Sequence, residues 1–288
     1  MKVLIFGAGG QVGRALVAAA PTGRELIALT HADCDVAVRS AVEQAIEATG
    51  PDLVFNAAAY TAVDQAEAEP ERAATLNAAA PGWIAAAAAS AGARTIHIST
   101  DFVFAGNACR PILPDDAPRP SSVYGRTKLA GEAAVAAADP MALIVRTAWI
   151  YDAAGSNFVR TMLRLMGERD RLTIVADQVG TPTYARCLAS AVWTLADQGV
   201  NGLHHFTDAG LASWYDFAVA IQEEALSLGL LERAAEILPI RTEDYPTPAV
   251  RPAYSVLDKT STWALLPAPP PHWRVNLRAC LGEIARNG

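Results

Sequence analysis

The sequence predicts an α/β protein in which a Rossmann-type, doubly wound parallel sheet is followed by a smaller C-terminal lobe, partly interleaved with it. Two observations support this fold class. Short apolar runs alternate with helical stretches through the first half, and the runs are apolar nearly throughout, as in strands buried on both faces. With 288 residues, 52% of them hydrophobic, the chain can bury the core that such a fold needs. We place the first domain at residues 1–150 and the lobe at 151–288.

The elements follow in order along the first half. Apolar runs predict strands, at residues 3–7, 25–29, 52–58, 95–99 and 143–147. The segments between them have helical composition and periodicity, at residues 10–20, 40–49, 71–91 and 124–138. The second half has a looser rhythm, with helices expected at 157–168, 184–196, 214–228 and 275–285, a strand at His204 and His205, and proline-rich loops. Trp83, Trp193 and Trp214 are expected in the core, and His97 in a structural role.

Composition excludes several classes of function. The formal net charge is −7 and there is no basic run, so neither nucleic acid nor an anionic membrane surface is an expected partner. The four cysteines are widely spaced and form no pattern typical of a disulfide framework or a zinc site, as expected in a reducing compartment. No apolar stretch has the length of a signal peptide or a membrane span. We therefore expect a soluble, cytoplasmic protein.

A glycine-rich segment follows the first strand and precedes the first helix. Gly7 permits a tight turn, Gly10 lets the backbone approach a pyrophosphate, and Gly13 lets the helix pack close to the strand. Gln11 and Val12 lie at the start of the helix, whose free N–H groups attract phosphate. An ordinary strand-to-helix turn is the alternative, but the position at the start of a βαβ unit favours a dinucleotide.

The end of the second strand bears on the choice of dinucleotide. An acidic side chain there would bind the adenosine ribose hydroxyls of NAD, whereas a basic one would accept the 2′-phosphate of NADP. The chain has Thr30 and His31 at this point, with Asp33 and Asp35 a little later. Since no acid stands at the expected place, we expect NADPH, with NADH also accepted.

Tyr124 and Lys128 are four residues apart and therefore lie on one face of a predicted helix. A lysine ammonium one turn from a phenol favours the phenolate, which would lower the pKa of Tyr124 towards a range useful for proton transfer. Thr100 ends the preceding strand, at the carboxyl edge of the sheet where open α/β folds bind ligands. The alternative is a solvated helix face, but the three residues together predict a catalytic set.

The glycine pattern, this Thr–Tyr–Lys set and the order of elements resemble the extended short-chain dehydrogenase/reductase superfamily. Within it, nearly the whole chain resembles the dTDP-4-dehydrorhamnose reductase family. The segments that carry the resemblance are GQVG (10–13), NAAAYTAVD (56–64), STDFVF (99–104), YGRTKLAGE (124–132), RTAWIY (146–151), NF (157–158), DQVGTPT (177–183), SW (213–214) and RP (251–252).

The resemblance implies an enzyme that reduces the C4 ketone of dTDP-6-deoxy-L-lyxo-4-hexulose, a nucleotide sugar, to dTDP-L-rhamnose. Tyr124 would be the general acid, Lys128 would bind the nicotinamide ribose, and Thr100 would donate a hydrogen bond to the carbonyl oxygen. The resemblance also implies cofactor contacts by Ala57, Ala58 and Ala59. It implies substrate contacts by Thr61, Val63, Trp149, Asn157 and Arg251. For Trp149 a core role competes with a pocket role, and for Arg251 a solvated side chain is the alternative.

The chain also departs from the family pattern. Some members are described as dimers bridged by Mg²⁺ bound to glutamates, but this chain has Arg14 and Arg186 where two of these glutamates are expected. We therefore expect no metal requirement and no metal-bridged dimer. Two other functions are compatible with the motifs, a nucleotide-sugar 4-epimerase and a regulatory subunit similar to the beta subunit of methionine adenosyltransferase. The motifs leave the C4 stereochemistry, rhamnose or talose, open.

Overall fold

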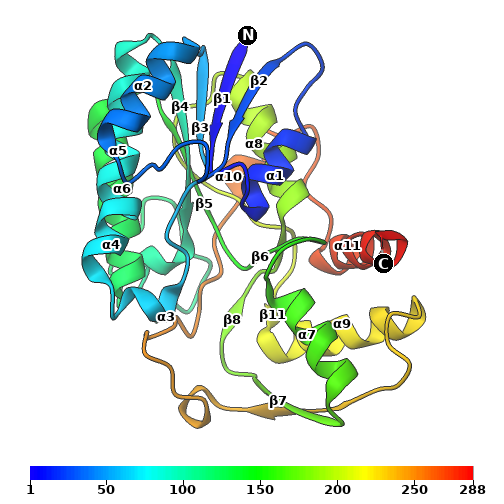
Figure 1. The fold of residues 1–288 in the computed structure, drawn as a ribbon. Coiled ribbons are helices and arrows are strands. Elements are labelled where there is room, and N and C mark those ends of the chain that lie inside the picture. The colour runs from blue at the N-terminus through cyan, green and yellow to red at the C-terminus, as the bar shows by residue number, and fades with distance from the viewer. Residues whose placement is uncertain (288) are drawn as a thin grey trace.

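The computed structural model describes residues 1–287 and contains a six-stranded parallel sheet with helices on both faces (Figure 1). The strand order is β10-β5-β4-β3-β1-β2, and all neighbouring strands are parallel. The strands are β1 (Lys2–Phe6), β2 (Glu25–Leu29), β3 (Leu53–Asn56), β4 (Arg94–Thr100), β5 (Leu143–Thr147) and β10 (Gly202–His205). The order reverses at β1, which lies between β2 and β3. In doubly wound folds ligands bind beside such a switch point, at the carboxyl ends of the strands.

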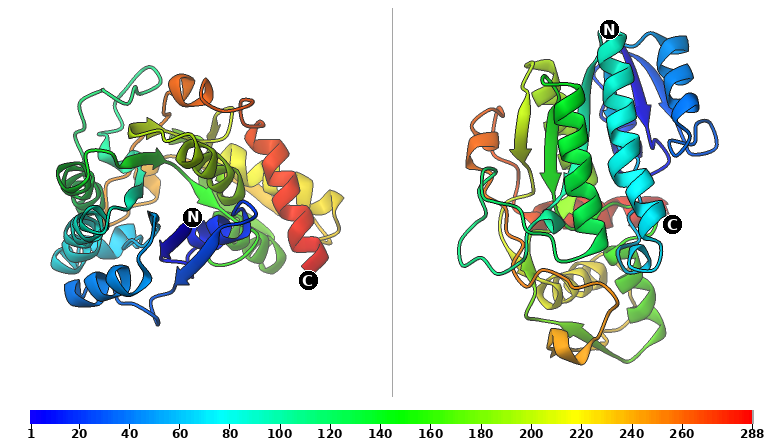
Figure 2. Two further views of the ribbon diagram at one scale, coloured as in Figure 1. Left: turned by 90° about the horizontal axis from the view of Figure 1, so that it is seen from above. Right: turned by 90° about the vertical axis from the view of Figure 1, so that its left-hand side faces the viewer.

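Side chains that alternate along each strand supply the two cores of this region. On β1, Val3 and Ile5 point to the face covered by α1 (Gln11–Ala18) and α8 (Ala185–Asp197). Leu4 and Phe6 point to the other face, which is covered by α2 (Arg39–Thr49) and α5 (Ala80–Ser90). Both pairs are fully buried, as the twofold period of a central strand requires. Figure 2 shows the two helical layers from above and from the side.

The predicted helix at residues 71–91 is interrupted in the structure. It consists of α4 (Pro70–Ala74), a π-helical turn (Thr75–Ala79) and α5. The extra residue in the wide turn directs Asn77 inward, where its side chain is completely buried. α6 (Val123–Ala138) packs against this turn at Gly131, where a Cβ atom would lie 2.0 Å from the carbonyl oxygen of Asn77. The interruption therefore fixes how closely α6 approaches, and it is typical of functional sites.

A smaller lobe lies beyond the carboxyl edge of the sheet (Figure 1). Its main elements are α7 (Phe158–Glu168), α9 (Trp214–Ser227) and the parallel pair β7 (Arg171–Val175) and β12 (Glu236–Ile240). The C-terminal helix is α11 (Trp273–Asn287). The remaining elements of the chain are short: α3 (Val63–Ala66), β6 (Ile150–Tyr151), β8 (Val179–Gly180), β9 (Thr183–Tyr184), β11 (Ala212–Ser213) and α10 (Thr260–Trp263), of which α10 packs on β10.

The chain passes between the sheet and the lobe more than once. After β6 and α7 it returns to form α8 and β10, and it then re-enters the lobe at β11. The Trp193 ring on α8 is 2% exposed, lies 4.6 Å from the ring of Phe55, and donates to the carbonyl oxygen of Leu16 at 2.9 Å. Residues after 150 thus complete the sheet and its core, and the division at residue 150 stays a prediction.

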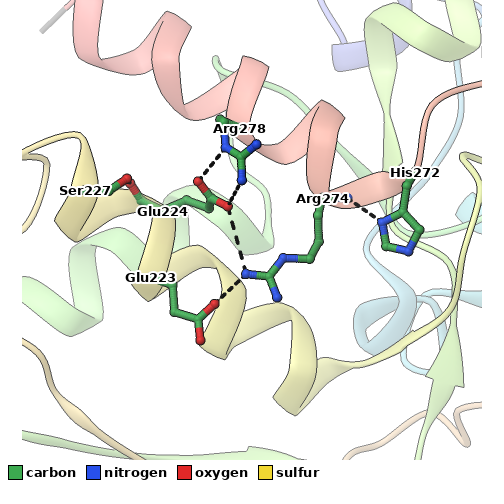
Figure 3. Close-up of polar contacts among 6 residues, drawn as sticks. All are labelled: Glu223, Glu224, Ser227, His272, Arg274 and Arg278. Carbon is green, nitrogen blue, oxygen red and sulfur yellow. Dashed lines mark hydrogen bonds and ion pairs between the residues drawn. The ribbon is translucent and has the colours of Figure 1, made fainter.

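Ion pairs connect α11 to α9 (Figure 3). Arg278 makes two hydrogen bonds to the carboxylate of Glu224, at 2.8 and 2.6 Å, and Arg274 pairs with Glu223. Glu224 is buried, and the hydrogen bonds from Arg278 are the main reason that its pKa lies below the ordinary value. These contacts hold the C-terminal helix against the lobe.

Within residues 1–287, no helix combines the length with the apolar character needed to cross a membrane.

Candidate functional site

The glycine loop lies at the carboxyl end of β1, beside the switch point. Gly7 has a positive φ of 77°, and a Cβ there would lie 2.5 Å from the backbone nitrogen of Ala58. A Cβ on Gly13 would lie 2.1 Å from the carbonyl oxygen of Gly7, so the helix packs directly on the loop. Gly10 is exposed, and its N–H donates to the Gly7 carbonyl at 3.0 Å. Side chains at Gly7 or Gly13 would fill this cradle, which fits a dinucleotide phosphate at the start of α1.

Two contacts bring the loop that follows β6 over the glycine loop. The Asn157 amide donates to Gln11 at 3.0 Å, and Arg14 donates to the carbonyl oxygen of Ala154 at 3.2 Å. Asn157 also caps α7, because its side-chain oxygen accepts the Arg160 N–H at 3.1 Å. The structure thus places Asn157 beside the glycine loop, and its predicted contact with substrate stays a prediction.

The end of β2 differs from the sequence expectation. Asp33 turns back onto Thr30, and its carboxylate accepts the Thr30 N–H at 2.9 Å and the hydroxyl at 2.6 Å. These hydrogen bonds hold the pKa of Asp33 below its ordinary value. The Thr30 methyl group would lie 3.7 Å from a Cβ on Gly9. The Asp33 carboxylate therefore does reach the end of β2, although Asp33 stands four residues beyond Leu29, the last residue of the strand.

Thr100, Tyr124 and Lys128 meet at the carboxyl end of β4, where α6 begins. All three are buried, with 6%, 9% and 2% of their surface exposed. Ser122 caps α6 by accepting the Gly125 N–H at 3.1 Å, which fixes the turn that carries Tyr124. The Thr100 hydroxyl donates to Asp101 at 3.0 Å and accepts the Phe102 N–H at 3.2 Å. The segment after β4 therefore orients the Thr100 hydroxyl.

The electrostatics of this set differ from the expectation. Burial raises the pKa of Tyr124 to about 12, a hydrogen bond from Thr100 opposes the shift, and the charge of Asp101 adds to it. Burial lowers the pKa of Lys128 to about 8. The Lys128 ammonium donates to the carbonyl oxygen of Ile98 at 2.7 Å and is not among the groups that act on Tyr124. The expected lowering of the Tyr124 pKa by Lys128 is wrong for this structure, because desolvation dominates.

The cofactor-side and substrate-side segments meet around the residues that follow β3. Ala57, Ala58 and Ala59 are half-buried and lead directly to Thr61, which is exposed. Val63 begins α3 and packs in the same apolar cluster as Tyr124. Thr61 and Val63 therefore lie next to the predicted catalytic residues.

Arg251 is bound to α3 from the far end of the chain. Its guanidinium makes two hydrogen bonds to the carboxylate of Asp64, at 3.0 and 2.7 Å. The Arg251 side chain is 28% exposed, so it is a held and accessible cation rather than a freely solvated one. The pair places the positive charge of Arg251 beside α3, next to Val63.

Arg251 also lines a cavity of about 490 Å³ in the lobe. Apolar side chains from α7 and β7 form much of its wall, among them Phe158, Leu165 and Ile174. Polar side chains such as Thr173 and Gln178 also line it, and Arg169 and Arg171 contribute two further guanidinium groups. A cavity with an apolar wall, polar side chains and cationic groups beside it is typical of a small-molecule site.

Two tryptophans stack beside this cavity. The rings of Trp149 and Trp214 are 3.6 Å apart and nearly parallel, at 6°. Trp149 has a positive φ of 49°, rare for a bulky residue, and such strain clusters at functional sites. A Cβ on Gly180 would lie 2.6 Å from the Trp149 ring, so that glycine makes room for it. The expectation that Trp214 belongs to the core is only partly right, because its ring also lines the cavity.

Comparisons with known proteins decide the family. Residues 1–286 match the model of the RmlD substrate binding domain family. The chain is 41% identical to a dTDP-4-dehydrorhamnose reductase of Escherichia coli, over 99% of this chain and 98% of that protein. It is 44% identical to one of Mycolicibacterium smegmatis, over 98% of this chain and 86% of that protein. The chain belongs to the dTDP-4-dehydrorhamnose reductase family.

Solved structures of this family agree. A dTDP-4-dehydrorhamnose reductase of Clostridium acetobutylicum superposes with a TM-score of 0.92 at 40% identity, covering 99% of both chains. One from Bacillus anthracis, solved in complex with NADP, superposes with a TM-score of 0.93 at 33% identity, covering 98% of this chain and 99% of that one. A UDP-glucose 4-epimerase of Thermotoga maritima shares only the fold, with a TM-score of 0.80 at 18% identity.

The arginines that depart from the family pattern make other contacts here. Arg14 hydrogen-bonds to two backbone carbonyls, and Arg186 pairs with Glu283, which also accepts the Tyr184 hydroxyl at 3.0 Å. In the described part of the chain, no cluster of three or more His, Cys, Asp or Glu side chains could hold a metal ion. The absence of a metal requirement and of a metal-bridged dimer remain predictions of the sequence.

Several residues of the site were not found from the sequence. The cavity wall comes from α7 and β7, whose only signal was an amphipathic helix followed by a strand of alternating exposure. Asn77 is another: its amide joins the backbone of Tyr60, at 2.8 and 3.0 Å, to Thr127 on α6, at 3.3 Å. No sequence pattern indicated that the helix would open there and direct this amide inward.

Proposed function

We propose that the protein catalyses the NADPH-dependent reduction of dTDP-6-deoxy-L-lyxo-4-hexulose at C4 to give dTDP-L-rhamnose. The observation that carries the proposal is the juxtaposition of Thr100 and Tyr124 with the glycine cradle on one side and, through Val63 and Arg251, with the lobe cavity on the other. Membership of the reductase family supports the choice of substrate and of NADPH.

Tyr124 acts as the general acid in this proposal. The bound nicotinamide supplies a hydride to C4, and the phenolic proton of Tyr124 goes to the C4 oxygen as it becomes an alkoxide. Burial keeps Tyr124 protonated at neutral pH, since its pKa is about 12. The proton is therefore present when the substrate binds, and an alkoxide is basic enough to take it.

Thr100 stabilises the charge that develops on the C4 oxygen. The Phe102 N–H holds the hydroxyl oxygen in place, and the single hydroxyl hydrogen, which points to Asp101 in this structure, turns to the C4 oxygen when the substrate binds. Lys128 lies one helical turn from Tyr124 and binds the nicotinamide ribose in this proposal. Ala57, Ala58 and Ala59 allow the cofactor to approach β3 closely, because their side chains are small.

The nucleotide part of the substrate extends towards the lobe. We assign the cavity to the apolar face of the base and Arg251 to the diphosphate, because a diphosphate needs a cation and Arg251, one of three arginines that line the cavity, is held by two hydrogen bonds to Asp64 on α3, next to Val63. Trp149 and Thr61 lie between these parts of the site and contact the sugar. Replacing Arg251 by Ala raises the KM for the nucleotide sugar and leaves NADPH affinity unchanged.

NADPH is the cofactor in this proposal, and NADH is accepted less well. We place the enzyme in the cytoplasm, where the free thiols of Cys34, Cys109, Cys187 and Cys280 stay reduced. No metal takes part in the reaction.

The test is NADPH consumption with the hexulose generated in situ, followed by identification of the sugar product. Stoichiometric oxidation with dTDP-L-rhamnose formed supports the whole proposal, and a talose product would correct only the stereochemistry. Tyr124→Phe should lower kcat by about 100-fold or more while NADPH binding persists, whereas Tyr215→Phe on α9 serves as the matched control. Absence of oxidation with either cofactor would favour the epimerase or regulatory-subunit function instead.

A further inference from the structure

Three polar side chains form a line through the buried layer between β3, β4 and α6. Asn56, His97 and Lys128 are 1%, 0% and 2% exposed. The Asn56 amide nitrogen lies 3.2 Å from His97 Nδ1, and His97 Nε2 lies 3.4 Å from Lys128 Nζ. At its other end the line reaches the loop that borders the glycine cradle, because the Ala58 N–H donates to Asn56 Oδ1 at 3.2 Å.

The direction of each hydrogen bond follows from the fixed donor at Ala58. A backbone N–H can only donate, so the Asn56 atom that faces it is the oxygen, and the atom that faces His97 is the NH₂ group. That group can only donate, so His97 Nδ1 is an acceptor. Burial is the main reason that the pKa of His97 lies well below its ordinary value, so the ring is neutral. A neutral ring with an acceptor at Nδ1 carries its hydrogen on Nε2.

This tautomer directs an N–H bond at the Lys128 nitrogen. An ammonium group has three donors and no acceptor, so it cannot hydrogen-bond to Nε2–H, whereas an uncharged amine can accept it. The remaining partner of Lys128, the Ile98 carbonyl oxygen, takes a hydrogen from either form. The line of hydrogen bonds therefore stabilises the amine over the ammonium.

Burial is the main cause of the lowered pKa of Lys128, and no neighbouring charge adds to it. The titratable and charged groups on the surrounding elements are Tyr124, Arg126 and Glu132 on α6, Arg94 on β4, Arg146 on β5, Asp101 after β4, Asp64 on α3, and Glu71 and Arg72 on α4. Among them only Glu132 acts on the charge of Lys128, and it favours the ammonium. Glu132 is moreover paired with Arg146 at 2.7 Å.

We propose that His97 is a positioning residue whose tautomer, set by Asn56, keeps Lys128 able to lose its proton near neutral pH. The proposal rests on the proposed function, in which Lys128 stands beside the general acid. It also connects the loop at Ala58 to the lysine, so that a change in the cradle reaches Lys128 through three hydrogen bonds. If His97 only filled space in the core, another side chain of similar size could replace it, and its tautomer would have no effect on Lys128.

The test measures the titration of Lys128 directly, in the full chain without substrate. The sequence contains three lysines, Lys2, Lys128 and Lys259, so NMR of protein labelled at the lysine Cε gives three signals, which Lys259→Arg and Lys128→Arg assign. His97→Gln presents a carbonyl oxygen to Lys128 in place of the N–H, and Asn56→Ser replaces an obligatory donor by a hydroxyl that can accept. Both should raise the midpoint of Lys128 by about one pH unit, a tenfold gain in proton affinity.

His205→Gln is the matched control. His205 is also fully buried and neutral, on β10 of the same sheet, but its Nδ1 faces the Ile112 carbonyl oxygen at 3.1 Å. A raised midpoint in the His97 and Asn56 variants, but not in the His205 variant, supports the proposal. An unchanged Lys128 midpoint in folded His97→Gln or Asn56→Ser overturns it. If His97→Gln does not fold, Asn56→Ser alone decides. If the wild-type protein oxidises no NADPH, the proposed function fails while this titration still gives its answer.

Discussion

The buried ion pair between Glu132 and Arg146 offers a quantitative test of how the site is held. Their side chains are 7% and 3% exposed, and two hydrogen bonds of 2.9 and 2.7 Å join them. Ser99 donates a third to the same carboxylate. Glu132→Gln removes the negative charge and leaves the Arg146 guanidinium buried without compensation. Breaking a buried pair from one side typically costs about 3–5 kcal/mol, and because the amide keeps one oxygen acceptor we expect about 3 kcal/mol.

A double variant separates the charge from the packing. With Leu at both positions, no charge of this pair remains buried. The double variant should therefore be more stable than Glu132→Leu or Arg146→Leu alone, and its loss of stability should be smaller than the sum of the two single losses. Urea unfolding followed by circular dichroism gives the free energy of unfolding of each form. Glu168→Gln is the control, because its pair with Arg164 is exposed and should contribute nothing measurable. A single-variant cost below about 1 kcal/mol, or strict additivity, would refute this account of the pair.

Three further predictions concern other parts of the molecule. Asp33→Asn removes a carboxylate from the end of β2 and should raise affinity for NADPH relative to NADH, measured as the ratio of the two Kd values; an unchanged ratio would separate Asp33 from the ribose. Gly131→Ala places a Cβ 2.0 Å from the Asn77 carbonyl oxygen, so it should cost about 3 kcal/mol in urea unfolding, while Gly167→Ala, in open space, should not. Glu224 has a lowered pKa, so its pair with Arg278 stabilises the fold above about pH 4.5 and is lost as the pH falls through the lowered pKa; the stability gap to Glu224→Gln should therefore close in acid.

The sequence was sufficient for the elements whose signal is local. Buried strands such as β1 and β3 are short apolar runs between turns, and Gly7 and Gly13 stand where the tight turn and the close helix packing leave no room for a side chain. Thr100 could be predicted from its position at the end of an expected strand. Tyr124 and Lys128 could be predicted from their spacing of four residues, which puts them on one face of a helix.

What could not be predicted depends on contacts between distant segments. β7 pairs with β12 across more than sixty residues of chain, and Arg251 meets Asp64 across 187 residues. The desolvation that raises the pKa of Tyr124 is likewise a property of the assembled core, so the effect expected from Lys128 alone had the wrong sign. His97 appeared structural because its partners, Asn56 and Lys128, come from other elements.

The return of the chain to the sheet after the lobe has begun has a consequence for cooperativity. α8 supplies Leu188, Val192 and Trp193 to the core beneath β1 and β3, and β10 covers the edge of β5. A fragment ending at residue 150 would expose this apolar surface and an unpaired strand edge, and it would associate with other chains rather than fold alone. Because the chain enters and leaves α8 and β10 through the lobe, we expect the lobe and the sheet to be coupled in unfolding. Unfolding of the two parts is thus one concerted event, and a ligand bound between them protects the entire chain.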